Sequence, residues 1–182
     1  MRNRLIPASA LCCIAAVAAA AFGGGGNPSP PIIPDPRLTP GDVLPVTAKD
    51  VCVAGYTKKV RNVPEAVKMQ VFRAYGIDPK TINTREWEID HTQSLELGGS
   101  NSTKNLFPEK YDINWNGYQV GAHTKDHLEN VLHALVCSGK ISLAEAQEAI
   151  RTNPVTKTNW ITAYRKYIGE LPKWKPPTHK GG

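Results

Sequence analysis

Residues 87–106 read WEIDHTQSLELGGSNSTKNL, and the expected fold is built around them. Trp87 and Ile89 alternate with the acids Glu88 and Asp90, which predicts a half-buried strand that ends at the following histidine. A carboxylate and an imidazole therefore stand next to each other where the strand runs into a loop.

The remainder of this stretch predicts a return of the chain. Leu95 and Leu97 alternate in the same way, so we expect a second short strand or extended arm there. Gly98 and Gly99 permit a tight turn, and Asn105 follows within fifteen residues of the strand end.

Outside this stretch the apolar spacing mostly predicts helices. The segment 51–57 alternates enough for a short strand or a turn. Helices are expected from Pro64 to Tyr75, from Ala122 to Cys137, from the capping box at Ser142 to a point before Pro154, and from Trp160 to Ile168. The predicted fold class is α+β with little sheet.

The two ends of the chain differ in composition from the middle. Residues 1–22 join two arginines to an alanine-rich apolar stretch, which predicts a signal peptide; an uncleaved anchor is the alternative, and Pro7 and the weak apolarity of alanine argue against it. Proline and glycine dominate both flanks of the expected domain. The expected divisions are a signal peptide (1–22), a Pro/Gly-rich linker (23–45), a folded domain (46–170) and a basic Pro-rich tail (171–182).

The charge balance favours a polyanionic partner. The chain of 182 residues has a formal charge of +6, and removal of Arg2 and Arg4 with the leader would leave +4. Such a balance suits nucleic acid, although basic secreted proteins with other partners are common.

Four cysteines are present, and two of them lie in the expected leader. Cys52 and Cys137 remain in the mature chain, and export would place them in an oxidising compartment, so we expect one disulfide. A reactive or metal-binding thiol pair is the alternative.

The Asp90-His91 pair has the groups that phosphodiester hydrolysis needs. That reaction requires a base to activate water and a cation to neutralise charge on the phosphate and the departing oxygen. Histidine titrates near neutrality, and carboxylates suit hard divalent ions. An isolated Asp-His pair more often starts a turn, with the aspartate capping backbone amides.

The pair is not isolated, because Asp90-His91, the Gly98-Gly99 turn and Asn105 together resemble the HNH endonucleases, whose fold is called the ββα-metal or His-Me finger. The resemblance implies that Asp90 holds a metal, that His91 is the general base, and that Asn105 bonds backbone across the loop and holds the histidine.

The resemblance extends to small secreted HNH-like proteins of bacteria. It includes the stretch from Cys52 to Arg61 and the residues Lys125, Asp126, Glu129 and His133, and it covers most of residues 50–151.

The third metal ligand departs from the family pattern, because no histidine follows Asn105 at the usual short spacing. Two pairs compete on the helix from Ala122: Glu129 with His133, and His123 with His127, each four residues apart. We favour Glu129 and His133, which lie beside the apolar stripe and which the resemblance selects. An ordinary surface pair is the alternative for them, and a structural zinc site is the alternative for His123 and His127.

Arg61 and Lys125 are candidates for contacts with phosphate, because a guanidinium can grip two phosphate oxygens and an ammonium can bind one; solvated surface is the equal alternative for each. The resulting hypothesis is a secreted or periplasmic endonuclease, monomeric and not membrane-bound after signal removal. It would use one divalent ion; Mg²⁺ is the default, and Mn²⁺ and Zn²⁺ are the alternatives. Its substrate would be nucleic acid, DNA in preference to RNA, cut without sequence specificity. The second hypothesis is a catalytically silent module of the same fold that binds DNA, an envelope polymer or a protein.

Overall fold

The computed structural model describes residues 32–176. The expected signal peptide and parts of the expected linker and tail lie outside this range. The helices are α1 (Ala48–Val51), α2 (Tyr56–Val60), α3 (Glu65–Ala74), α4 (Ala122–Cys137), α5 (Leu143–Ile150) and α6 (Trp160–Tyr167). The strands are β1 (Trp87–His91), β2 (Leu106–Lys110), β3 (Ile113–Trp115) and β4 (Tyr118–Val120). The chain is therefore an α+β protein, as predicted.

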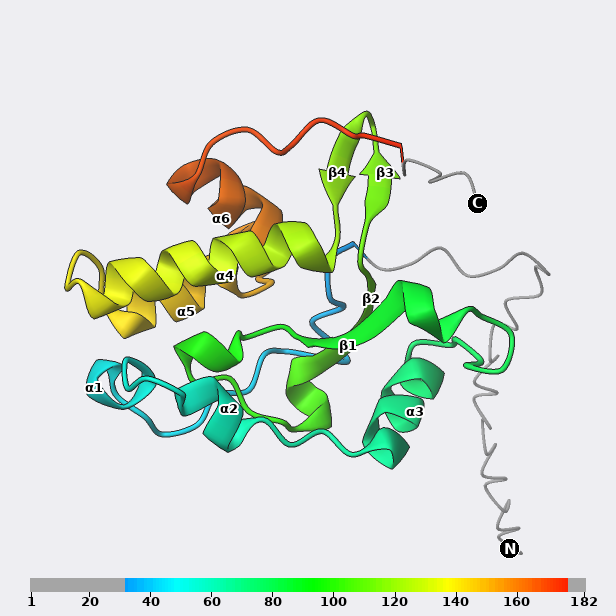
Figure 1. The fold of residues 1–182 in the computed structure, drawn as a ribbon, viewed down its shortest axis with the longest axis horizontal. Helices are drawn as coiled ribbons and strands as arrows, with labels where there is room; N and C mark the ends of the chain where they lie inside the picture. The colour runs from blue at the N-terminus through cyan, green and yellow to red at the C-terminus, as the bar shows by residue number, and fades with distance from the viewer. Residues whose placement is uncertain (1–31, 177–182) are drawn as a thin grey trace, which may run out of the picture.

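Two small antiparallel sheets supply the strands. β1 pairs with β2, and its register sets Trp87 opposite Lys110 and His91 opposite Leu106. β3 pairs with β4 in a separate hairpin. Figure 1 shows the β1–β2 pair at the centre, with α4, α5 and α6 on one side and α1, α2 and α3 on the other.

The partner of β1 is not the segment that the sequence predicts. Leu95 and Leu97 lie in a 3-10 turn, η2 (Leu95–Leu97), which Ser94 caps and Gly98 ends in the left-handed region. Both leucines are buried, because a tight turn can bury positions two residues apart as a strand does. The expectation of a second strand at this place was wrong.

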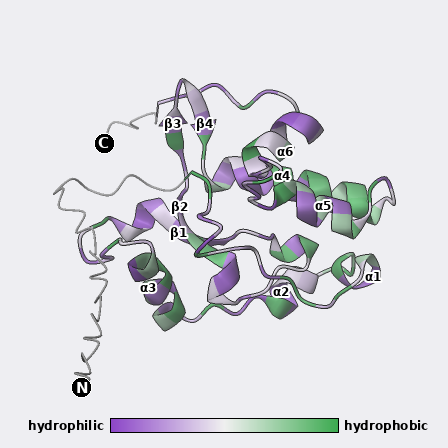
Figure 2. Cartoon of the chain, turned by 180° about the vertical axis from the view of Figure 1, so that it is seen from behind, coloured by the Kyte–Doolittle hydropathy of each residue, from purple (hydrophilic) through white to green (hydrophobic). Residues whose placement is uncertain are grey.

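The main core lies between α4, α5 and α6. Leu128, Leu132 and Val136 of α4 pack with Trp160 and Tyr164 of α6. Hydrophobic and hydrophilic residues alternate along these helices in Figure 2, which is typical of helices with one buried face. The four helices expected from apolar spacing are confirmed within one or two residues at their ends.

A smaller cluster fixes α3 against the central strands. Phe72 of α3, Ile77 and Trp87 of β1 are all buried in it, and the Phe72 and Trp87 rings meet edge to face. This contact packs the second half of α3 against the start of β1.

The segment 51–57 was expected as a strand or a turn; residues 52–55 form a turn between the end of α1 and the start of α2, and no strand is present there. Thr47 and Asp50 form a capping box at the start of α1, and Gly55 takes the left-handed conformation before α2. The predicted disulfide is confirmed: Cys52, just after α1, is bonded to Cys137 at the end of α4.

The described parts of both flanks pack on the domain. Leu44 N donates to Gly98 O at 2.8 Å, and Trp160 Nε1 donates to Ile32 O at 2.7 Å. Leu171 is buried, and Gln119 N donates to Pro172 O at 2.8 Å. The described parts of the Pro/Gly-rich linker and of the basic tail are therefore held by contacts with the folded domain. Over the described range, no helix has both the length and the apolar character to cross a membrane.

The disulfide is expected to contribute strongly to stability. It closes a loop across 85 residues of sequence. In the chain-entropy treatment such a loop contributes at most about 4 to 5 kcal/mol. Urea unfolding of the protein with and without a reductant should show a loss of roughly this size; a loss below about 1 kcal/mol would contradict an unfolded state constrained by this loop.

Candidate functional site

Three charged side chains meet where β1 ends beside α4. Lys125 Nζ donates to Asp90 Oδ2 at 2.7 Å and to the backbone oxygen of His91 at 2.7 Å, and it also pairs with the Glu129 carboxylate. Lys125 has a relative exposure of 0%. We call the oxygens of Asp90, Glu129 and the His91 backbone the cation cradle.

The helix positions that face the core explain this meeting. The buried residues of α4 include Lys125, Leu128, Glu129, Leu132 and Val136, whose positions recur at helical spacing and so share one face of the helix. Two charged residues therefore occupy core positions at the end of α4 that lies against β1. Buried charges are costly unless paired, and here they are paired with each other and with Asp90.

The pKa values of Asp90, Lys125 and Glu129 reflect both their burial and their electrostatic effects on one another. Burial would raise the pKa of Asp90, but the Lys125 ammonium outweighs it and holds that pKa below the usual range. Burial would lower the pKa of Lys125, but Asp90 and Glu129 raise it. Burial raises the pKa of Glu129 to about 7, against the opposing effect of Lys125. The ammonium therefore stays charged.

A further acid lies on β2 and was missed by the sequence analysis. Glu109 is fully buried, and neither of its carboxylate oxygens has a hydrogen-bond partner among the described residues. Burial and the neighbouring Asp90 charge raise its pKa well above the ordinary value. The β1–β2 register sets Glu109 opposite Glu88, and the sequence analysis missed this acid because it did not predict β2.

His91 is buried and held through one ring nitrogen. Its Nε2 lies 3.1 Å from Asn101 Oδ1, while Asn101 Nδ2 donates to Val60 O at 2.8 Å. Because Asn101 Nδ2 donates to Val60 O, the Asn101 oxygen faces the imidazole and accepts a hydrogen bond from the Nε2–H group. Nδ1 then carries the lone pair that can accept a proton.

The pKa of His91 favours the neutral ring. Burial lowers this pKa, and the Asp90 charge and the Asn101 hydrogen bond offset only part of the effect. A neutral imidazole near pH 7 is the form that a general base needs.

Asn105 closes the loop that follows β1. Its Oδ1 accepts from Gln93 N at 2.7 Å, and its Nδ2 donates to Gln93 O at 3.0 Å and to Ser100 O at 2.9 Å. The side chain is completely buried. The expected bonding of backbone across the loop is present in the structure.

A cavity of about 300 Å³ opens onto the cation cradle. Its ionisable lining residues are Arg61, Glu88, Asp90, His91, Glu96, Asp126 and Glu129. The lining acids outnumber the lining cations. Burial, and after it the charge of neighbouring acids, raises the pKa of Glu88 to about 7 and raises the pKa of Asp126 above its ordinary value.

Arg61 and His91 also line a second cavity of about 430 Å³, on the side of α3. Lys68, Trp87 and Tyr111 contribute to its walls. Arg61 is exposed, so its guanidinium is available to an anionic ligand at the boundary of the two cavities.

Two predicted assignments do not fit the geometry. Lys125 was expected to contact phosphate, but it is enclosed and hydrogen-bonded to protein oxygens, so its ammonium is not available to a phosphate. His133 lies away from the cation cradle: its Nε2 is 3.0 Å from Val51 O, so the imidazole supports the residue before Cys52 instead of completing a ligand set with Glu129.

The alternative pair, His123 and His127, has separate partners. His123 Nδ1 lies 2.9 Å from an Asp112 carboxylate oxygen, and His127 Nδ1 lies 3.2 Å from the Tyr164 hydroxyl. The structure therefore does not bring these two imidazoles together as a zinc site.

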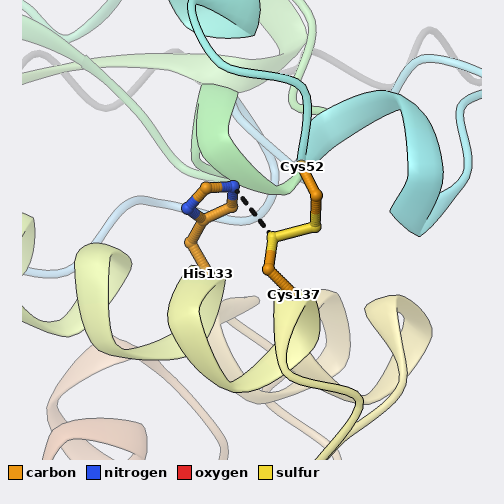
Figure 3. Close-up of side chains that lie close together, drawn as sticks. All are labelled: Cys52, His133 and Cys137. Carbon is orange, nitrogen blue, oxygen red and sulfur yellow. Dashed lines mark hydrogen bonds between the residues drawn. A yellow bond between two sulfur atoms is a disulfide. The ribbon is translucent and has the colours of Figure 1, made fainter.

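One group of three metal-ligating residues comes together among the described residues: Cys52, His133 and Cys137. Figure 3 shows the His133 ring beside the disulfide, with Nε2 3.3 Å from Cys137 Sγ. Because metal binding requires thiolates, this group could hold a metal only after reduction of the disulfide.

Comparisons with protein-family models, with curated proteins and with solved structures gave no match to this chain.

Replacement of Asn105 by aspartate should destabilise the domain. The change removes both Nδ2 donations and places a charge in a fully buried position. We expect a loss of at least about 3 kcal/mol in the free energy of unfolding, measured by urea denaturation. Asn114→Asp is the matched control, because Asn114 is exposed and its Oδ1 accepts one hydrogen bond from Gly117 N. Equal losses of stability in both variants would contradict the role of Asn105 in closing the loop.

Replacement of Asn101 by leucine should lower the pKa of His91 further. The hydrogen bond that His91 Nε2 donates to Asn101 Oδ1 favours the protonated ring, so its loss shifts the equilibrium toward the neutral form. NMR titration of the His91 ring signals measures the change, with Asn153→Leu as a remote control. An unchanged or raised pKa would contradict the inferred role of Asn101.

Proposed function

We propose that this chain is an endonuclease that hydrolyses nucleic-acid phosphodiester bonds with His91 as general base, as the resemblance to the HNH endonucleases implies. The observation that carries the proposal is the juxtaposition of a neutral, oriented imidazole with a cation cradle on the wall of one cavity. A base and a cation site within reach of the same ligand are the two requirements of this chemistry.

The chain's own residues supply the protein part of the reaction. His91 accepts a proton from water at Nδ1, because Asn101 occupies Nε2. The Arg61 guanidinium binds phosphate oxygens from the exposed rim of the cavities. Asn105 holds the loop after His91 in place.

The donor set fits a divalent ion. Asp90 and Glu129 already direct carboxylate oxygens toward one cation, and the His91 backbone oxygen joins them. Without His133 the set contains only oxygen atoms, which suits Mg²⁺ or Mn²⁺ better than Zn²⁺. When bound, such an ion would offset charge on the phosphate and the leaving oxygen.

Export from the cytoplasm belongs to the same proposal. The disulfide fits an oxidising compartment, and the basic, alanine-rich start of the sequence fits a signal peptide. The basic charge of the chain suits a nucleic-acid substrate bound through its phosphates, DNA before RNA.

A second candidate function, binding without catalysis, is favoured by one observation. Lys125 fills the cation cradle, and a chain in which it never leaves would have no room there for an ion. Such a protein would keep the fold and the Arg61 rim as a binding surface.

Plasmid cleavage separates the two candidates. We expect the folded protein to nick and linearise plasmid DNA with Mg²⁺ or Mn²⁺, and His91→Ala to slow the reaction by about 10² to 10⁴-fold because the base is lost. His127→Ala is the matched control, since His127 is exposed on α4 and contacts Tyr164.

Two results would overturn the nuclease proposal. Intact plasmid with every ion would leave the binding function, to be tested by mobility shift. Equal cleavage by the wild type and His91→Ala would place the activity outside this site.

A further inference from the structure

The Lys125 ammonium uses its full bonding capacity inside the protein. An ammonium has three hydrogens, and Nζ has three oxygen partners: Asp90 Oδ2, the Glu129 carboxylate and the His91 backbone oxygen. No donor remains for a substrate, and the side chain is fully enclosed. Lys125 is therefore bound as a cation by the residues that would otherwise hold a metal.

The position among these oxygens that Nζ occupies cannot hold a second cation at the same time. The distances of 2.7 Å from Nζ to Asp90 Oδ2 and to His91 O are those of charge-assisted hydrogen bonds, so an ion at this point would overlap the ammonium. Binding of a divalent ion at this position, between Asp90, Glu129 and the His91 backbone oxygen, requires Lys125 to leave it.

The cavity has more negative charge than one ammonium can balance. Glu88, Glu96 and Asp126 line it in addition to the two cradle acids, and Glu96 Oε2 has no hydrogen-bond partner among the described residues. Arg61 also lines the cavity, but the five acids still exceed the two cations, so a further positive charge would relieve this repulsion between like charges at close range. The surroundings therefore favour a divalent ion while Lys125 opposes it.

We propose that Lys125 is an internal competitor that sets the affinity of the cation cradle for a divalent, oxygen-preferring ion. This inference rests on the proposed function, which supplies the ion. In the ion-free protein Lys125 keeps Asp90 and Glu129 together; in the ion-bound protein its ammonium moves off these carboxylates. Lys125 is thus a positioning residue whose removal strengthens ion binding.

Ion binding without nucleic acid tests the proposal. Mn²⁺ is titrated into the folded protein and the free ion is counted by electron paramagnetic resonance, for the wild type and for Lys125→Met. We expect the variant to bind Mn²⁺ about 5- to 150-fold more tightly, the usual range for coupling between two ligands. Lys166→Met is the matched control, because Lys166 is an exposed lysine that pairs with Glu145 on α5, and it should bind as the wild type does.

Thermal unfolding covers the case in which Lys125→Met is unstable without an ion. Removal of the ammonium leaves paired acids without a partner, so the variant should melt lower than the wild type, and saturating Mn²⁺ should raise its melting temperature by more than that of the wild type. Equal or weaker Mn²⁺ binding by the variant, or a variant that stays unfolded at saturating Mn²⁺, would overturn the proposal.

The cleavage assay keeps this result separate from the proposed function. Plasmid cleavage that depends on a divalent ion, together with unchanged Mn²⁺ affinity in Lys125→Met, would contradict the proposed role of Lys125 and leave the nuclease proposal standing. Tighter Mn²⁺ binding by Lys125→Met with no cleavage by the wild type would retain the competitor and reject the nuclease.

Discussion

The burial of one ammonium group between a strand and a helix is the constraint on which the candidate site depends. Lys125 comes from α4, and its partners Asp90 and His91 come from the end of β1, so this contact fixes the distance between the two elements. A charge in this position is tolerated only when every hydrogen finds an acceptor. The geometry around His91 is consequently set by a polar contact inside the protein.

Local patterns in the sequence were sufficient to predict most helices and the first strand. The apolar spacing of α4, α5 and α6 reports a buried face directly, because these helices pack on one another. β2 was missed because its run, Leu106-Phe107-Pro108-Glu109-Lys110, contains a proline and is buried on both faces, so it shows no alternation. α1 and α2 are too short to show helical periodicity.

The site was predictable only where its residues are neighbours in sequence or share a familiar motif. Asp90, His91 and Asn105 were selected in this way. Glu129 was selected from the same resemblance, and the structure brings it near Asp90 because Lys125 is bonded to both. Lys125 and Glu129 occupy core positions of α4, but charged residues in a predicted helix suggest a solvated face. Asn101 contacts His91 across the fold, and Glu109 is buried by its position in β2; no local pattern in the sequence reveals either.

The disulfide and His133 acquire a role in this arrangement without being ligands. Cys52 is bonded to Cys137, and His133 lies 3.0 Å from Val51 O, so α4 holds the end of α1 at two adjacent points. The chain then runs through α2 to Val60, whose backbone oxygen accepts from Asn101, and Asn101 in turn accepts from His91 Nε2. The segment anchored by the disulfide therefore ends at the contact that orients the imidazole. This continuity gives a physical reason for Cys52, His133 and Cys137 to occur in one chain with Asp90 and His91: they hold the segment that ends at the Asn101 contact with the His91 ring, whereas Lys125 contacts the His91 backbone directly.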